Sequence, residues 1–238
     1  MLDCSVVSSP KQSYSGHCGG QKGIWDETPS LSREDTIFLI DWDDTLLASS
    51  WLAAQGLRLD SVEIPHDVVL QLQALEKSIT KLLTRAINSS CRVWIVTNAE
   101  HGWVELSAMK FLPSVSKLLH KVEIMSARST FQNQFQNKPD MWKVNAYSHI
   151  FQQTFHRKLE SGFNGLFNVL SLGDSNFERN AVLHLSSSVK GVLAKSVKFV
   201  ERPSMQQLMR QLEIVYENLD QVVSSPETID LMLTIEYL

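Results

Sequence analysis

Two aspartates, Asp41 and Asp43, stand directly after an apolar run from Ile37 to Ile40. An apolar run without alternation is typical of a strand buried on both faces of a parallel sheet. Ligands of such sheets bind outside the carboxyl ends of the strands, so a site is expected here. Residues two apart on an extended segment leave on the same face. Carboxylates so close repel each other unless they share a proton or bind a hard cation such as Mg²⁺.

This carboxylate pair suits phosphoryl transfer. Asp41 is predicted as the nucleophile, because an aspartyl-phosphate intermediate splits one difficult displacement into two easier ones. Asp43 is predicted as the general acid and base, which protonates the leaving oxygen and then deprotonates the attacking water. The alternatives are that Asp41 only binds a cation and that Asp43 only caps a helix or a turn.

Polar side chains at two later points could assist the same reaction. Thr97 and Asn98 end a predicted strand, where a hydroxyl and an amide could donate hydrogen bonds to phosphate oxygens. Lys143, near a predicted helix start, could balance negative charge, since phosphoryl transfer depends mainly on positioning and charge stabilisation. Lys138 and Lys110 are competing choices for this lysine, and a lysine near a helix start is often a solvated surface residue.

A second acidic pair, Asp174 and Glu178, follows the strand predicted at 167–172 and spans a predicted helix start. Asp174 is predicted to bind Mg²⁺ directly, and Glu178 to bind it through water or to orient a ligand. Asp41 and Asp43 complete the predicted metal site. The alternative is an ordinary helix N-terminus whose acidic residues complement the helix dipole.

Two arginines, Arg128 and Arg179, are predicted near the same edge of the sheet. Either guanidinium could bind a second anionic group of a substrate, or could instead form a surface salt bridge. Arg128 is taken as the substrate-binding choice, together with Thr97 and Asn98.

The elements that position these residues alternate between strand and helix. A strand, a helix and a strand in sequence imply a right-handed crossover and a parallel pair, which brings Thr97 to the same edge as Asp41. We therefore expect an α/β fold, a Rossmann-like three-layer sandwich with a mainly parallel sheet. The predicted strands lie at 37–40, 93–96, 121–125, 167–172 and 197–200. The predicted helices lie at 65–89, 102–110, 139–159, 177–183 and from 203, with short ones near 51–55, at 113 and after 224.

Composition indicates one globular domain with a polar N-terminal extension. Residues 1–35 are rich in Ser and Gly without periodicity and are predicted to be a flexible tail, which leaves 36–238 as the catalytic domain. A net charge of −4 and a pI near 6.0 argue against nucleic acid as a partner. Three cysteines without metal-type spacing favour a reducing compartment, and no segment has the length of a membrane span. We expect a soluble, cytoplasmic protein.

Taken together, the motifs resemble those of the haloacid dehalogenase (HAD) superfamily. The residues DWDDT at 41–45 resemble its first motif, and GDSNFE at 173–178 resemble its fourth, with Glu where Asp is commoner. The resemblance extends over about 35–224. By this resemblance the roles are Asp41 as nucleophile, Asp43 as general acid and base, Thr97 as phosphate-binding hydroxyl, Lys143 as third-motif lysine, and Asp174 with Glu178 as metal-binding pair. Short stretches also resemble uncharacterised HAD-like proteins of plants and protists: Trp42, 102–103, 126–128 and 142–143.

The resemblance implies a Mg²⁺-dependent phosphomonoester hydrolase, a phosphatase, that works through an aspartyl-phosphate intermediate. Most HAD proteins carry a cap domain, but the segments on either side of Thr97 leave little room for one. With a minimal cap or none, the site is expected to be open and suited to a phosphorylated small molecule or a phosphoprotein. The alternative is a catalytically idle HAD fold that serves as a binding or scaffold protein.

Overall fold

Parallel strands form the centre of the molecule. The computed structural model describes residues 31–235. Its six strands form one sheet, in the order β3-β2-β1-β4-β5-β6, in which every neighbouring pair is parallel. The strands are β1 Thr36–Ile40, β2 Arg92–Thr97, β3 Glu123–Ser126, β4 Phe167–Gly173, β5 Val192–Lys198 and β6 Ile229–Met232. The order reverses direction between β1 and β4, which is the switch point where α/β sheets bind ligands.

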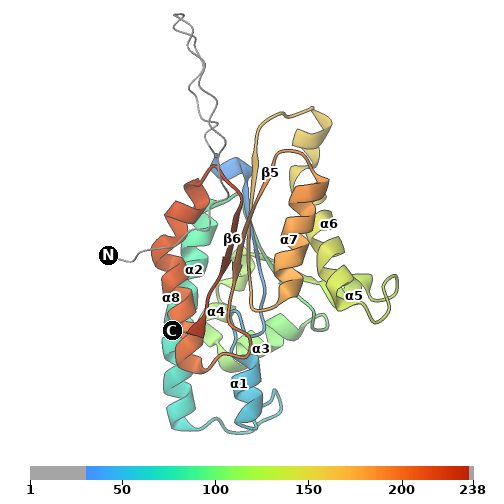
Figure 1. Cartoon of the computed structure of the whole chain (residues 1–238). Coiled ribbons are helices and arrows are strands. Elements are labelled where there is room, and N and C mark those ends of the chain that lie inside the picture. Colours follow the sequence, from blue (N-terminus) through green and yellow to red (C-terminus); the bar gives the residue numbers. More distant parts are fainter. Residues whose placement is uncertain (1–30, 236–238) are drawn as a thin grey trace, which may run out of the picture.

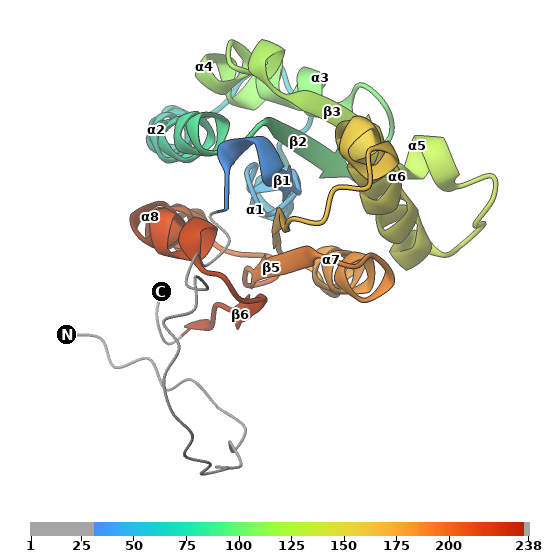
Figure 2. The same cartoon turned by 90° about the horizontal axis from the view of Figure 1, so that it is seen from above.

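Helices cover both faces of this sheet, which confirms the predicted three-layer α/β/α sandwich. Figure 2 shows α2 and α8 on one side of the strands and α5, α6 and α7 on the other. The helices are α1 Ser49–Ala54, α2 His66–Ser89, α3 Trp103–Phe111, α4 Pro113–Ser116, α5 Ala127–Phe131, α6 Pro139–Glu160, α7 Asn176–Ser188 and α8 Met205–Ser224. Between β1 and α2 the chain forms the short α1 and loops, at the end of the molecule shown lowest in Figure 1. No cap domain is inserted there.

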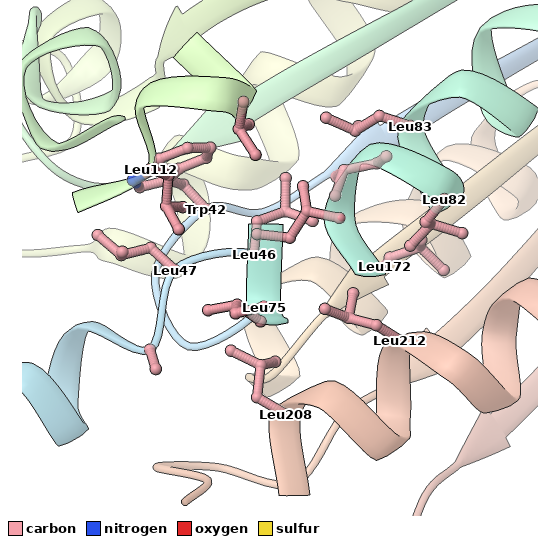
Figure 3. Packing of buried hydrophobic residues seen from close by; sticks show 14 of the residues in the cluster. Trp42, Leu46, Leu47, Leu75, Leu82, Leu83, Leu112, Leu172, Leu208 and Leu212 are labelled. Atoms are coloured by element: carbon pink, nitrogen blue, oxygen red, sulfur yellow. The ribbon is translucent and has the colours of Figure 1, made fainter. Parts of the chain in front are cut away.

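Alternation along β1 divides the buried residues into two cores. Phe38 and Ile40 pack with α2, α3, α4 and α8, whereas Ile37 and Leu39 pack with α6 and α7. Trp42, just beyond the strand, belongs to the first core and is fully buried (Figure 3). Both faces of β1 are therefore covered, as its unbroken apolar run predicts.

Two sequence-based assignments near the C-terminus were wrong. The strand predicted at 197–200 overlaps only the last two residues of β5, Val197 and Lys198, because Lys195 and Ser196 interrupt the apolar pattern of its earlier part. The segment after residue 224, predicted as a helix, contains β6, which pairs with β5. β6 is a short edge strand with mostly exposed side chains, so it lacks the apolar run that marks a buried strand.

The N-terminal prediction can be compared with the structure only at its end. The predicted tail at 1–35 lies outside the described residues as far as residue 30. Arg33–Asp35 is a short 3-10 helix. Arg33 Nε donates a hydrogen bond to the carbonyl of Ser90 at 3.0 Å, which fixes this turn against the end of α2. Within residues 31–235, no helix combines the length and apolar character needed to cross a bilayer.

Lys195 offers a test of the packing of β5 against α8. Its side chain is fully buried and donates to the carbonyl of Val223 at 2.8 Å, and burial lowers its pKa from 10.5 to about 8. Between these two pH values the unfolded chain binds more protons than the folded one, so raising the pH stabilises the fold. We expect wild type to gain stability from pH 8 to 10.5 relative to Lys195→Met in urea unfolding. The exposed Lys77→Met is the control, and parallel pH profiles of wild type and Lys195→Met would contradict the expectation.

Candidate active site

The carboxyl ends of β1, β2 and β4 bring the predicted site residues together at the switch point. Asp41 follows β1 directly, and its N–H donates to the carbonyl of Leu172 in β4 at 2.9 Å. The loop then turns tightly: the carbonyl of Trp42 accepts from the N–H groups of Leu46 and Leu47, at 2.9 Å each. These three apolar side chains are fully buried (Figure 3), so the core holds the loop in place.

A buried lysine links the nucleophile candidate to the second acidic motif. Lys143, near the start of α6, is fully buried, and its Nζ lies 2.6 Å from Oδ1 of Asp41 and 2.9 Å from Oε1 of Glu178. The same ammonium donates to the carbonyl of Val96 in β2. Burial by itself would lower the pKa of Lys143, but the two carboxylates outweigh it and raise the pKa. Lys143 therefore remains an ammonium ion.

The geometry decides between the three lysines that the sequence left open. Lys143 contacts Asp41, whereas Lys110 donates to the carbonyl of Ser61 and Lys138 is exposed at the end of a loop. Burial and the charge of Glu178 act to raise the pKa of Asp41, and the ammonium of Lys143 acts to lower it. The ammonium lies 2.6 Å from Oδ1, and this contact keeps Asp41 ionised. The second oxygen of Asp41, Oδ2, has only a long contact, 3.3 Å from Oγ1 of Thr45.

Asp43 is held by a tryptophan that sequence analysis did not assign to the site. Nε1 of Trp103, the first residue of α3, lies 2.9 Å and 3.1 Å from the two carboxylate oxygens of Asp43. Oγ1 of Thr97, the predicted phosphate-binding hydroxyl, also donates to Asp43 at 3.3 Å and accepts from the N–H of Ala99 at 2.9 Å. Burial raises the pKa of Asp43, although the hydrogen bonds from Trp103 and Thr97 oppose the rise. Trp103 is 60 residues from Asp43, so only the tertiary fold reveals the contact.

Glu178 both caps the start of α7 and contacts Lys143. Its Oε2 accepts from the N–H of Ser175 at 3.1 Å, which is half of a capping box at the start of α7, and also from the Ser175 hydroxyl at 2.5 Å. Its other oxygen holds Lys143. Gly173 has no side chain because a Cβ there would lie 2.3 Å from Cγ of Glu178. With both oxygens bound, Glu178 positions the lysine.

Asp174 is the least engaged carboxylate of the group. Its backbone carbonyl accepts from Nζ of Lys198 at 2.9 Å, while its carboxylate makes no hydrogen bond or ion pair with residues 31–235. Burial and the negative charges of Glu178 and Asp44 raise its pKa to about 7. Lys198, at the end of β5, is a second buried lysine at this edge that sequence analysis missed.

The donors that remain fit a magnesium ion with few protein ligands. Among residues 31–235, no three His, Cys, Asp or Glu side chains are grouped so as to hold a metal ion. Asp43 and Glu178 are engaged elsewhere, so the four predicted ligands are not assembled around one point. Asp41 and Asp174 retain carboxylate oxygens without strong partners. Mg²⁺ commonly binds one or two carboxylates and keeps several waters, so this oxygen donor set suits it.

Three further residues were considered for substrate binding: Asn98 at the end of β2, and the two arginines Arg128 and Arg179. Asn98 donates from Nδ2 to the carbonyl of Pro139 at 3.2 Å, and its buried Oδ1 has no hydrogen-bond partner among the described residues. Arg128 lies at the surface, 3.6 Å from the carboxylate of Glu100. Arg179 pairs with Asp230 of β6. Both arginines are thus in surface ion pairs, the alternative that the sequence left open.

Comparisons with known proteins identify no family for this chain. A scan against protein-family models, a search of curated proteins and a search of solved structures each found no match. The interpretation of the site therefore depends on the geometry of its residues.

Replacement of Lys143 tests how much its ion pairs with Asp41 and Glu178 contribute to the stability of the fold. Lys143→Met leaves the carboxylates of Asp41 and Glu178 buried without their cation, which should lower the free energy of unfolding by about 3–5 kcal/mol. The measurement is urea unfolding at neutral pH. The control is Lys77→Met on the exposed side of α2, which should change stability by less than about 0.5 kcal/mol. Equal, small effects of both substitutions would contradict the network.

Proposed function

We propose that the chain is a Mg²⁺-dependent phosphomonoesterase of the HAD type that acts through an aspartyl-phosphate intermediate. The observation that carries the proposal is the contact of Lys143 with Oδ1 of Asp41 at the switch point of the sheet, with Asp43 two residues further on. One carboxylate is thereby fixed and partly neutralised, while a second carboxylate next to it can carry a proton. This is the arrangement that nucleophilic and acid-base catalysis require together.

The first step transfers the phosphoryl group to the enzyme. Because Lys143 holds Oδ1, Oδ2 is the oxygen of Asp41 that attacks the phosphorus atom. The bond between phosphorus and the ester oxygen breaks, and Asp43 gives its proton to that oxygen. A neutral alcohol leaves, and the aspartyl phosphate remains. The positive charge of Lys143 stabilises the negative charge that accumulates around Asp41 during the transfer.

The second step releases phosphate. Asp43, now ionised, accepts a proton from a water molecule that attacks the same phosphorus atom. The bond between phosphorus and Asp41 breaks, which regenerates the carboxylate. Thr97 and Asn98 lie at the end of β2. The amide of Asn98 has a second N–H beyond the one given to Pro139, and the hydroxyl of Thr97 can donate to a phosphoryl oxygen once it leaves its 3.3 Å contact with Asp43.

Because Oδ2 of Asp41 is the attacking atom, Asp174 is the residue whose carboxylate remains to hold Mg²⁺. When bound, the ion would neutralise charge on the transferring phosphoryl group. The open side of the sheet, without a cap domain, is compatible with a phosphorylated small molecule or a phosphoprotein.

A catalytically idle HAD fold used as a binding protein is the second candidate. The observation in its favour is that Lys143, Asp41 and Glu178 satisfy one another as an ion-pair network, which can serve stability alone. That network gives no role to the carboxylate of Asp174. An additional carboxylate with a raised pKa and no partner among residues 31–235 favours the enzyme.

The nucleophile is tested by Asp41→Asn. An amide is a poor nucleophile, so the variant should lose at least about a thousandfold in kcat toward 4-nitrophenyl phosphate with Mg²⁺ present. The matched control is Asp44→Asn in the same loop, where Asn tolerates the positive φ of 55°. The control should retain turnover within about tenfold. An Asp41→Asn protein as active as the control would exclude the proposed mechanism.

The metal ligands are tested by comparing Asp174→Asn with Asp43→Asn. Loss of a direct ligand should raise the Mg²⁺ concentration for half-maximal turnover by about tenfold or more in Asp174→Asn. Asp43→Asn should lower kcat about a hundredfold or more with little change in that concentration, because the proton donor is lost instead. The measurement is turnover as a function of Mg²⁺ concentration, and the reverse pattern would exchange the two roles.

A further inference from the structure

A cavity of about 630 Å³ opens between α2 and the segment where α3 ends and α4 begins. Figure 2 shows α2 and α4 side by side on the same face of the sheet. The apolar part of the lining comes from Val69 and Leu72 of α2 and from Phe111 and Pro113 on the opposite wall. None of the residues of the proposed mechanism lines this cavity. Its volume lies in the range of sites that bind small molecules.

The cavity contains a carboxylate that is largely removed from water. Glu76 of α2 lines it and is only 5% exposed. Its Oε1 accepts from the N–H groups of Ser114 at 2.5 Å and Val115 at 3.3 Å, at the start of α4. Its other oxygen, Oε2, makes no hydrogen bond or ion pair within residues 31–235. A carboxylate oxygen with so little access to water is costly without a partner, so Oε2 is an acceptor that a ligand in the cavity can satisfy.

Three lysines place positive charge around the same cavity. Lys77 and Lys81, one turn apart, belong to the α2 wall, and Lys110 in the last turn of α3 belongs to the opposite wall. Lys110 also donates to the carbonyl of Ser61, which uses one of its three N–H bonds. The whole chain has a net charge of −4, so three lysines beside one carboxylate are a local excess of positive charge. An anionic group between the two walls can be paired from both sides.

We propose that this cavity binds a small zwitterion with an apolar body, the chemistry of an apolar α-amino acid. The ammonium group of the ligand donates to Oε2 of Glu76, and its carboxylate is paired with the lysines. Its side chain packs against Leu72 and Phe111, which removes it from water. A fatty acid would leave Glu76 without a partner, and an amine would leave the lysines without one. The inference is independent of the proposed function.

The first test compares phenylalanine with two analogues that each lack one charge. Hydrocinnamate has the ring and the carboxylate but no ammonium group, and phenethylamine has the ring and the ammonium group but no carboxylate. In isothermal titration calorimetry with the full chain, phenylalanine should bind with a Kd at least about tenfold below that of either analogue, because each analogue loses one charged contact. Equal Kd values for the three compounds would overturn the inference. So would the absence of binding by both phenylalanine and leucine, which carries the same two charges.

Variants of the charged groups assign each contact. Glu76→Gln keeps an oxygen for the start of α4 but removes the charge, so it should raise the Kd of phenylalanine about tenfold and not raise that of hydrocinnamate. The double variant Lys77→Met/Lys81→Met should raise the Kd of both carboxylates about fivefold and leave phenethylamine unaffected. The matched control is Lys117→Met/Lys121→Met, which makes the same change of charge at exposed positions outside the cavity. Equal effects of the two double variants would overturn the role of the lysines and with it the proposal.

Two threonines of α2 test the position of the ligand. Thr80 lines the cavity, whereas Thr84, one turn further on, is exposed and does not line it. Thr80→Trp fills the space and should raise the Kd of phenylalanine at least about tenfold, while Thr84→Trp should leave it unchanged. Circular dichroism establishes that both variants are folded. A folded Thr80→Trp protein that binds phenylalanine as tightly as wild type would place the ligand elsewhere and overturn the inference.

Discussion

The buried ammonium of Lys143 connects the candidate site with the packing of the helices against the sheet. Lys143 of α6 contacts Asp41 after β1, Glu178 of α7 and the carbonyl of Val96 in β2. A charge that is fully removed from water must be paired, so these elements can close around the lysine only if the carboxylates are ionised and in place. The contact that would prepare the nucleophile is thus also the contact that packs α6 and α7 against the sheet.

The other half of the site depends on apolar anchors between the acidic residues. Trp42 points into the core while Asp41 and Asp43 on either side of it stand at the sheet edge, so burial of one indole fixes two carboxylates. A second indole, that of Trp103, then joins Asp43 to α3. Burial of aromatic side chains supplies the rigidity that the proposed catalytic pair of carboxylates would require.

Sequence patterns predicted the elements with strong periodicity and the motifs that follow the central strands. β1 is buried on both faces, so its apolar run is unambiguous, and α2 and α6 are long. β6 was missed because an edge strand with exposed side chains has no such run. Lys143 could not be separated from Lys110 and Lys138, because the direction of a helical side chain is set by how the helix packs.

Trp103 and Lys198 illustrate a different limit. Each meets the site through tertiary contacts, and neither stands in a pattern that would single it out among the other tryptophans and lysines. The spacing of Asp174 and Glu178 in the sequence could not show whether Glu178 binds a metal, caps a helix or contacts a lysine. A glutamate in the first turn of a helix can do any of the three. The structure resolves this by giving one carboxylate oxygen to the helix cap and the other to Lys143.

Detection of phosphate on Asp41 tests the central claim most directly. The measurement is rapid acid quench of wild-type protein with Mg²⁺ and an aryl phosphate, followed by mass spectrometry of the peptide that contains Asp41. The account predicts a transient mass increase of one phosphoryl group on that residue, formed before phosphate release and absent from Asp41→Asn. Steady turnover without a phosphorylated Asp41, or with phosphate on another residue, would contradict it.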